Sequence, residues 1–165
     1  MLSDDLENLR DPDTGPPRRE ANSSTEHFVF RLSSRTYALP PRSVEMVIAL
    51  PPIIPVPTAR PHVRGVVHVR GRIIAVLDLA ALIGLDAAAE PGPTARLVVV
   101  MARHPFAFVA DMTLGIWAFT NDAQKRATDD GPMIAGQIED RGGAATLLDP
   151  AAIVDHVIRG GAVTP

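Results

Sequence analysis

The sequence contains no cysteine and a single lysine, and aromatic residues make up only 4% of its 165 residues. A chain without cysteine forms no disulfide and offers no thiolate to a metal ion. The longest apolar runs, such as residues 97–102, are too short to cross a bilayer as a helix. The first ten residues are acidic and carry no long apolar segment, so no secretory signal is expected. We therefore expect a cytoplasmic, soluble protein that does not insert into membranes.

The charge is small and unevenly placed. The net charge is −3, and six acids and three arginines within residues 1–21 account for all of it. The rest of the chain is balanced and has no strong basic field, and the scarce aromatics offer few stacking platforms for bases. No nucleic-acid partner is expected, and that alternative rests on the arginines of residues 60–72 and on small SH3-like barrels.

The chain divides into a polar tail and a strand-rich body. Residues 1–25 are polar and include Pro16-Pro17, which predicts a disordered tail, and residues 161–165 form a C-terminal tail. Residues 26–160 form the folded domain. Short apolar runs alternate there with turn residues, while residues 120–132 predict a long surface loop. The predicted strands are 28–32, 44–50, 66–69, 73–77, 97–101, 106–110, 115–119, 133–138 and 144–148.

Two short helices resemble each other, which suggests two related halves. Residues 77–84 read LDLAALIG and residues 148–160 read LDPAAIVDHVIRG. Each follows a strand that ends in Leu-Asp, so Asp78 and Asp149 are placed to cap the helix N-termini. The pattern predicts a mainly β fold of two small barrels, each closed by a short helix.

The sequence offers no assembled catalytic or metal site. Asp78 and Asp149 are mirrored, but neither is followed by the Gly-containing turn of an aspartic protease. The five histidines form no i, i+4 pair, and neither a serine elbow nor a glycine-rich phosphate loop occurs. We therefore expect a binding module with no catalytic residue, metal or cofactor, and an aspartate-dependent hydrolase is the enzyme alternative.

Positive charge gathers in one predicted hairpin. Between residues 60 and 72 lie four arginines, Arg60, Arg64, Arg70 and Arg72, and no acid. Period-two alternation places Val67 and Val69 toward a core, and Val66, His68 and Arg70 on the opposite face. The positive side chains would then lie on the outer face and the turn, and the simplest interpretation is a solvated hairpin.

The stretch VRGVVHVRGRIIAVLDLAALIGL (residues 63–85) resembles the signature of the CheW-like family, V-x-G-x-x-N-x-R-G-x-I-x-P-V-x-D-L. FVFRLSSRTYALP, VEMV, FAFVADMTLGI and AATLLDPAAIV fall in register with other segments of that family, so the resemblance covers residues 27 to about 159. It implies two five-stranded, SH3-like barrels packed on a shared core. It also implies a non-catalytic adaptor of bacterial chemosensory arrays.

The resemblance implies partners and a mechanism. A methyl-accepting chemoreceptor's cytoplasmic helical hairpin would lie in an apolar groove between the barrels, and a CheA-type histidine kinase would bind through its regulatory domain at a barrel edge. Other CheW-like domains are further candidate partners. The protein would be cytoplasmic, on membrane-anchored receptor arrays.

Eight residues follow from the resemblance as receptor-binding candidates. Val44 and Val47 would supply apolar contacts, Val63 and Gly65 would shape the groove, and Gly71 would permit the turn after Arg70, the signature arginine. The full set is Val44, Glu45, Val47, Val63, Gly65, His68, Arg70 and Gly71.

Several positions depart from the family pattern. His68 replaces the usual Asn, Met46 replaces an acid that moves one place earlier to Glu45, and Ala75 and Ala80 stand where Pro and Arg are frequent. A one-residue shift on a strand turns a side chain to the opposite face. The alternative is therefore a divergent paralogue of a pilus or gliding pathway that binds only kinase or only receptor.

Overall fold

The fold was obtained as a computed structural model, which describes residues 23–57, 59–86, 90–120, 124–126, 131–141 and 143–160. The expected tails fall largely outside this part, since residues 1–22 and 161–165 are not described. Strand β1 (Ser24–Leu32) begins two residues before the predicted start of the domain.

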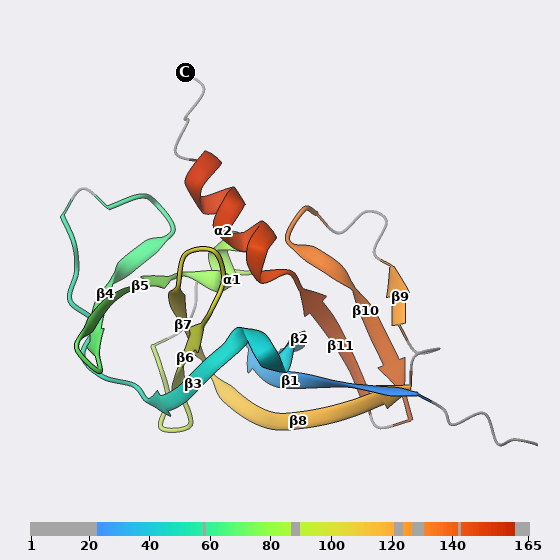
Figure 1. The fold of residues 1–165 in the computed structure, drawn as a ribbon. Coiled ribbons are helices and arrows are strands. Elements are labelled where there is room, and N and C mark those ends of the chain that lie inside the picture. The colour runs from blue at the N-terminus through green and yellow to red at the C-terminus, as the bar shows by residue number, and fades with distance from the viewer. Residues whose placement is uncertain are drawn as a thin grey trace, which may run out of the picture.

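Eleven strands of the described chain form two sheets (Figure 1). The first has the order β8-β1-β2-β11-β10-β9, and all its pairs are antiparallel except β2–β11. Its other strands are β2 (Arg35–Leu39), β8 (Met112–Thr120), β9 (Gln124–Arg126), β10 (Ile134–Asp140) and β11 (Gly143–Leu148). The sixth strand, β9, lies in the segment predicted to be a loop, so this sheet has one strand more than expected.

The second sheet has the order β3-β6-β7-β5-β4, with only β5–β7 parallel. Its strands are β3 (Val44–Ala49), β4 (Val63–Val69), β5 (Arg72–Leu77), β6 (Arg96–Val100) and β7 (Phe106–Ala110). A 3-10 turn, η1 (Pro41–Ser43), leads into β3. The whole second sheet thus lies between β2 and β8 of the first along the chain.

Each sheet also has hydrogen bonds between strands or strand ends that are not neighbours in its strand order. Ile54, after β3, exchanges two backbone hydrogen bonds of 2.9 Å with Val66 of β4, so the two edge regions of the second sheet meet. In the first sheet the Asp140 carboxylate at the end of β10 accepts from the Thr120 N–H of β8 at 3.2 Å. Curvature toward closure removes exposed strand edges. The predicted mainly β fold with two barrel-like sheets is confirmed.

The two helices are capped as the sequence predicts. The Asp78 carboxylate accepts from Ala81 N–H at 3.1 Å at the start of α1 (Leu79–Leu82). The Asp149 carboxylate accepts from Ala151 and Ala152 N–H at 2.9 and 3.2 Å at the start of α2 (Pro150–Arg159). Both carboxylates hold helix N-termini, and this accounts for their mirrored positions without catalysis.

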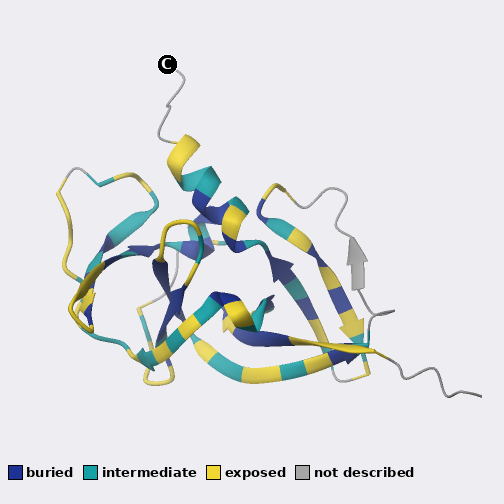
Figure 2. Ribbon diagram, in the orientation of Figure 1, coloured by how far each residue is buried: buried dark blue, intermediate teal, exposed yellow. Residues whose placement is uncertain are grey.

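One core joins the two sheets. Phe30 of β1 and Phe108 of β7 are both fully buried, with ring centroids 4.9 Å apart. Leu148 and Ile153 bring the end of β11 and α2 into the same cluster. Two smaller clusters fill the interiors of the individual sheets. Figure 2 shows the buried residues concentrated where the sheets face each other. The halves therefore form a single packing unit.

Buried His27 predicts a pH dependence of stability. Its ring packs edge-on against Phe119 with centroids 5.8 Å apart, and burial lowers its pKa below 6.5, against the opposing effect of a hydrogen bond to Thr25. The unfolded state then binds the proton more readily. We expect the free energy of unfolding to be independent of this group above pH 6.5 and to fall as the pH drops from there toward the folded pKa. Urea titrations at pH 5–8 measure this, and His27→Gln should flatten the slope between pH 6.5 and 5.

Candidate functional site

The β4–β5 hairpin has the two faces that alternation predicts. Val67 and Val69 are buried, with exposed fractions of 0% and 6%, and pack inside the second sheet with Ile74 and Val76. His68 is exposed, and its cross-strand partner Ile73 is 74% exposed. The outer face therefore presents both a polar ring and a large apolar side chain to solvent.

The hairpin turn is made by Arg70 and Gly71. Their φ angles are +47° and +78°, and the flanking residues Val69 and Arg72 pair directly. Two consecutive positive φ values in a two-residue loop are the mark of a type I′ turn, which matches the twist of the strands. Gly71 meets this requirement without strain. Arg70 occupies a backbone conformation that few residues favour, and its exposed side chain makes no hydrogen bond or ion pair within the described chain.

An ion pair ties the hairpin to β3. The Arg72 guanidinium donates to the Glu45 carboxylate, and both side chains remain partly exposed. This hydrogen bond, with the nearby charges of Arg72 and Arg70, holds the pKa of Glu45 below its usual range. Exposed pairs contribute little to stability, so we assign this pair a positional role at the end of the hairpin.

The eight predicted residues do not share one environment. Val47 is 37% exposed on the outer face of β3 beside Glu45, whereas Val44 is half-buried against the shared core. The two valines thus face opposite sides of β3. Gly65 is buried at a register shift of β4, and a side chain there would meet Ile54.

An apolar surface that sequence reasoning missed runs along the hairpin. We call it the hairpin strip: the residues on the side of β4 and β5 opposite Val67 and Ile74, which are Val63, Val66, His68, Ile73, Ala75 and Leu77, the last of them buried in the shared core. It begins at the exposed Ile73 and His68 near the turn and continues through Ala75 to Leu77. Val63 and His68 are the two predicted site residues that belong to it.

The far end of the hairpin strip opens into a cavity of about 330 Å³ beside α2, which we call the α2 pocket. Figure 1 shows α2 above the junction of the two sheets, close to the second sheet. The lining is almost wholly apolar, and His104 is its one residue with a titratable side chain. The lining residues are Val63, Ala75, Leu77, His104, Pro105, Phe106, Val154, Val157 and Ile158. The apolar cavity therefore lies between the second sheet and α2, and not directly between the two barrels, where the groove was expected.

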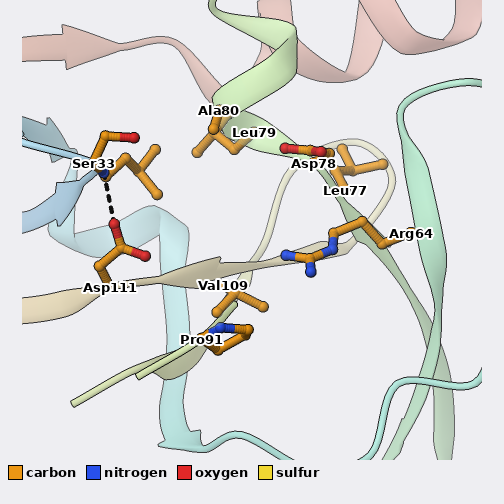
Figure 3. Close-up of a pocket in the computed structure, with 10 residues that line it drawn as sticks. Ser33, Arg64, Leu77, Asp78, Leu79, Ala80, Pro91, Val109 and Asp111 are labelled. Carbon is orange, nitrogen blue, oxygen red and sulfur yellow. Dashed lines mark hydrogen bonds between the residues drawn. The ribbon is translucent and has the colours of Figure 1, made fainter. Parts of the chain in front are cut away.

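The direct junction of the two sheets is polar and narrow (Figure 3). Arg64 points into this notch, and Ser33 N–H donates to the Asp111 carboxylate across it at 2.6 Å. The cavity measures about 10 Å³, room for about one water molecule. No apolar helix fits here. The hydrogen bonds here hold the β7–β8 connection against the end of β1, since Asp111 N–H also donates to Arg31 O at 3.0 Å.

Two other features are absent from the described residues. No group of three or more histidine or acidic side chains there is arranged to hold a metal ion. No helix among them is both long and apolar enough to span a membrane.

Comparison with known proteins identifies the family. The sequence profile of the CheW-like domain matches residues 26–157, most of the chain and nearly all of both sheets. The chain belongs to the CheW-like domain family. This membership makes it an adaptor or scaffold of the chemotaxis type.

Individual relatives agree with this assignment. The chain is 27% identical over 142 residues to the chemotaxis protein CheW of Thermotoga maritima, covering 84% of this chain and 93% of the relative. It is 29% identical over 108 residues to protein PilI of Pseudomonas aeruginosa, covering 65% and 60%. The scaffolding protein TtCheW from Thermoanaerobacter tengcongensis superposes with a TM-score of 0.73 at 17% identity, covering 79% of this chain and 92% of that structure. The last comparison shows a shared CheW-like fold.

Proposed function

We propose that this CheW-like protein is a non-catalytic chemosensory adaptor whose hairpin strip and α2 pocket receive a chemoreceptor's cytoplasmic helical hairpin. The observation that carries the proposal is the apolar strip that leads from the exposed Ile73, through the half-buried Ala75, into the α2 pocket. Scattered exposed aliphatics need no explanation, but a row that ends in an apolar cavity is typical of a docking surface. The proposal places the protein in the cytoplasm, at membrane-anchored receptor arrays.

The dimensions suit a helix. β4 has seven residues, which at about 3.3 Å per residue gives a strip of roughly 23 Å. A partner helix covers that distance with about 15 residues at 1.5 Å each, or about four turns. Apolar side chains at i, i+3, i+4 and i+7 would lie on the strip, with the largest near the α2 pocket.

The polar end of the strip would fix the direction in which the receptor helix lies. Arg70 and His68 are exposed at the turn end, while the α2 pocket at the other end is apolar. A guanidinium can bind a carboxylate through two parallel hydrogen bonds, so an acidic residue of the receptor helix would lie at the turn. The Arg72–Glu45 pair and Val47 would flank the same end.

The first sheet offers a separate surface for a CheA-type kinase regulatory domain or another CheW-like domain. Within the described chain β8 pairs only with β1, and it exposes Met112 and Ile116 at 37% and 51%. Figure 2 shows exposed and half-buried residues along most of β8. A one-sided strand with exposed aliphatics suits pairing or packing with a like fold.

A second candidate function is a divergent paralogue that binds only kinase or only receptor in a non-flagellar pathway. The similarity to PilI favours it, as do the changes at His68, Met46, Ala75 and Ala80. The two candidates differ in one observable. An adaptor co-purifies with both a receptor hairpin and a kinase regulatory domain when each is offered separately, and the paralogue with only one.

The test of the receptor site is Arg70→Asn. Asn tolerates positive φ, so this change removes the guanidinium and keeps the turn. We expect roughly tenfold weaker binding to an immobilised receptor hairpin, because a charge-assisted hydrogen bond is lost, with an unchanged urea midpoint. Arg31→Asn on β1 is the matched control. Equal affinity of both variants would remove Arg70 from the site.

A further inference from the structure

A proline-rich segment joins β3 to β4 and contacts α2 through Arg60. Residues 50–62 contain five prolines, which restrict the backbone and leave few donors. The segment is held at Ile54 by Val66 and at His62, whose carbonyl accepts from Asp78 N–H at 2.8 Å. The segment is therefore hydrogen-bonded to the second sheet at Ile54 and, at His62, to the residue that follows β5.

The side chain of Arg60, in this segment, reaches the end of α2. One nitrogen of its guanidinium, Nη1, donates to the carbonyls of Val157 and Ile158, each at 2.7 Å. The last carbonyls of a helix lack partners within the helix and carry partial negative charge. A permanently charged arginine satisfies two of them at once. The two bonded residues are 97 and 98 positions away along the chain.

Arg60 also contacts the opposite wall of the α2 pocket. Its backbone carbonyl accepts from Val63 N–H at 2.9 Å. Val63 lines the pocket from β4, and Val157 and Ile158 line it from α2. One residue therefore connects both walls of the cavity, although Arg60 itself does not line it.

We infer that Arg60 is a positioning residue that holds the end of α2 against the second sheet and so sets the width of the α2 pocket. This inference rests on the proposed function, because it assigns to Arg60 control over how tightly the receptor helix binds. The kinase surface on β8 lies outside this control. Loss of the contact frees the last turn of α2 while Asp149 still holds its first turn.

The first test uses the free protein. Amide hydrogen exchange of residues 156–160 is compared in the wild type, Arg60→Ala, Arg60→Lys and the control Arg31→Ala. We expect about tenfold faster exchange at the end of α2 in Arg60→Ala, with residues 151–154 unchanged. Lys retains a charge and donors, so Arg60→Lys should restore most of the protection. Wild-type exchange in Arg60→Ala would overturn the inference.

The second test measures binding of the full chain to a receptor hairpin and to a kinase regulatory domain. Arg60→Ala should weaken receptor binding about tenfold and leave kinase binding and the urea midpoint as in Arg31→Ala. Equal loss of both partners would show general destabilisation and would overturn a positioning role. A wild-type chain that binds no receptor hairpin would defeat the proposed function, and the exchange result on free protein would still decide whether Arg60 holds α2.

Discussion

Replacing Ile73 by aspartate is expected to lower affinity for a receptor hairpin roughly a hundredfold while leaving the fold intact. The side chain is 74% exposed, so its loss removes little from the core. Burying an isoleucine in an interface contributes about 1.5–3 kcal/mol, and a carboxylate there adds a desolvation cost. About 2.7 kcal/mol in total corresponds to that change in Kd. Titration with a labelled receptor hairpin measures it.

Ile116→Asp provides the matched control for this experiment. Ile116 is 51% exposed on β8 of the other sheet. The same substitution there should leave receptor binding unchanged and weaken binding of the kinase regulatory domain. Receptor affinity that falls equally in both variants, or in neither, would contradict the assignment of the receptor to the hairpin strip.

Replacing Gly65 by alanine is expected to cost about 3 kcal/mol of unfolding free energy or more. An added Cβ would lie 2.3 Å from the carbonyl oxygen of Ile54 and 2.9 Å from Ile53 Cγ2. That oxygen accepts a hydrogen bond from Val66 N–H at 2.9 Å, so it cannot retreat without breaking the contact that closes the second sheet. The free-energy cost of overpacking then adds to the cost of the unfavourable φ of +154°.

Gly71→Ala separates steric crowding from backbone strain. Gly71 has a φ of +78°, and nothing lies within 4 Å of an added Cβ. We expect a cost of about 1–2 kcal/mol from the left-handed backbone alone. Urea unfolding compares the two variants, and pulse proteolysis ranks them if Gly65→Ala accumulates poorly. If Gly65→Ala lowers the free energy of unfolding by no more than Gly71→Ala does, the segment around Ile54 moves to accommodate the added Cβ.

Local rules predicted the parts of the fold that depend on neighbouring residues. Period-two alternation placed Val67 and Val69 inside, and the Leu-Asp endings of two strands predicted both helix caps, because each pattern is decided within a few residues. The same rule separates Val44 from Val47, whose spacing of three puts them on opposite faces of a strand. Their assignment to a single surface came from the family resemblance.

The α2 pocket could not be predicted in this way. It forms where α2, near the end of the chain, contacts strands from the middle of the chain. No local sequence pattern specifies that these two distant segments come together. Ile73 was missed for a related reason: RIIAVL is aliphatic on both faces, so the sequence does not show which isoleucine faces solvent. Arg60 stood out only as part of a charge cluster, and its role depends on carbonyls almost a hundred residues away.

The insertion of the second sheet between β2 and β8 has a consequence for synthesis on the ribosome. All five strands of that sheet leave the tunnel before β8 does, so it can assemble first. β1 and β2 must meanwhile wait with their outer edges unpaired until β8 and β11 emerge. The nascent chain thus carries a completed β4–β5 hairpin beside a half whose strand edges are still open, and its yield in cells should depend on how quickly the final third is translated.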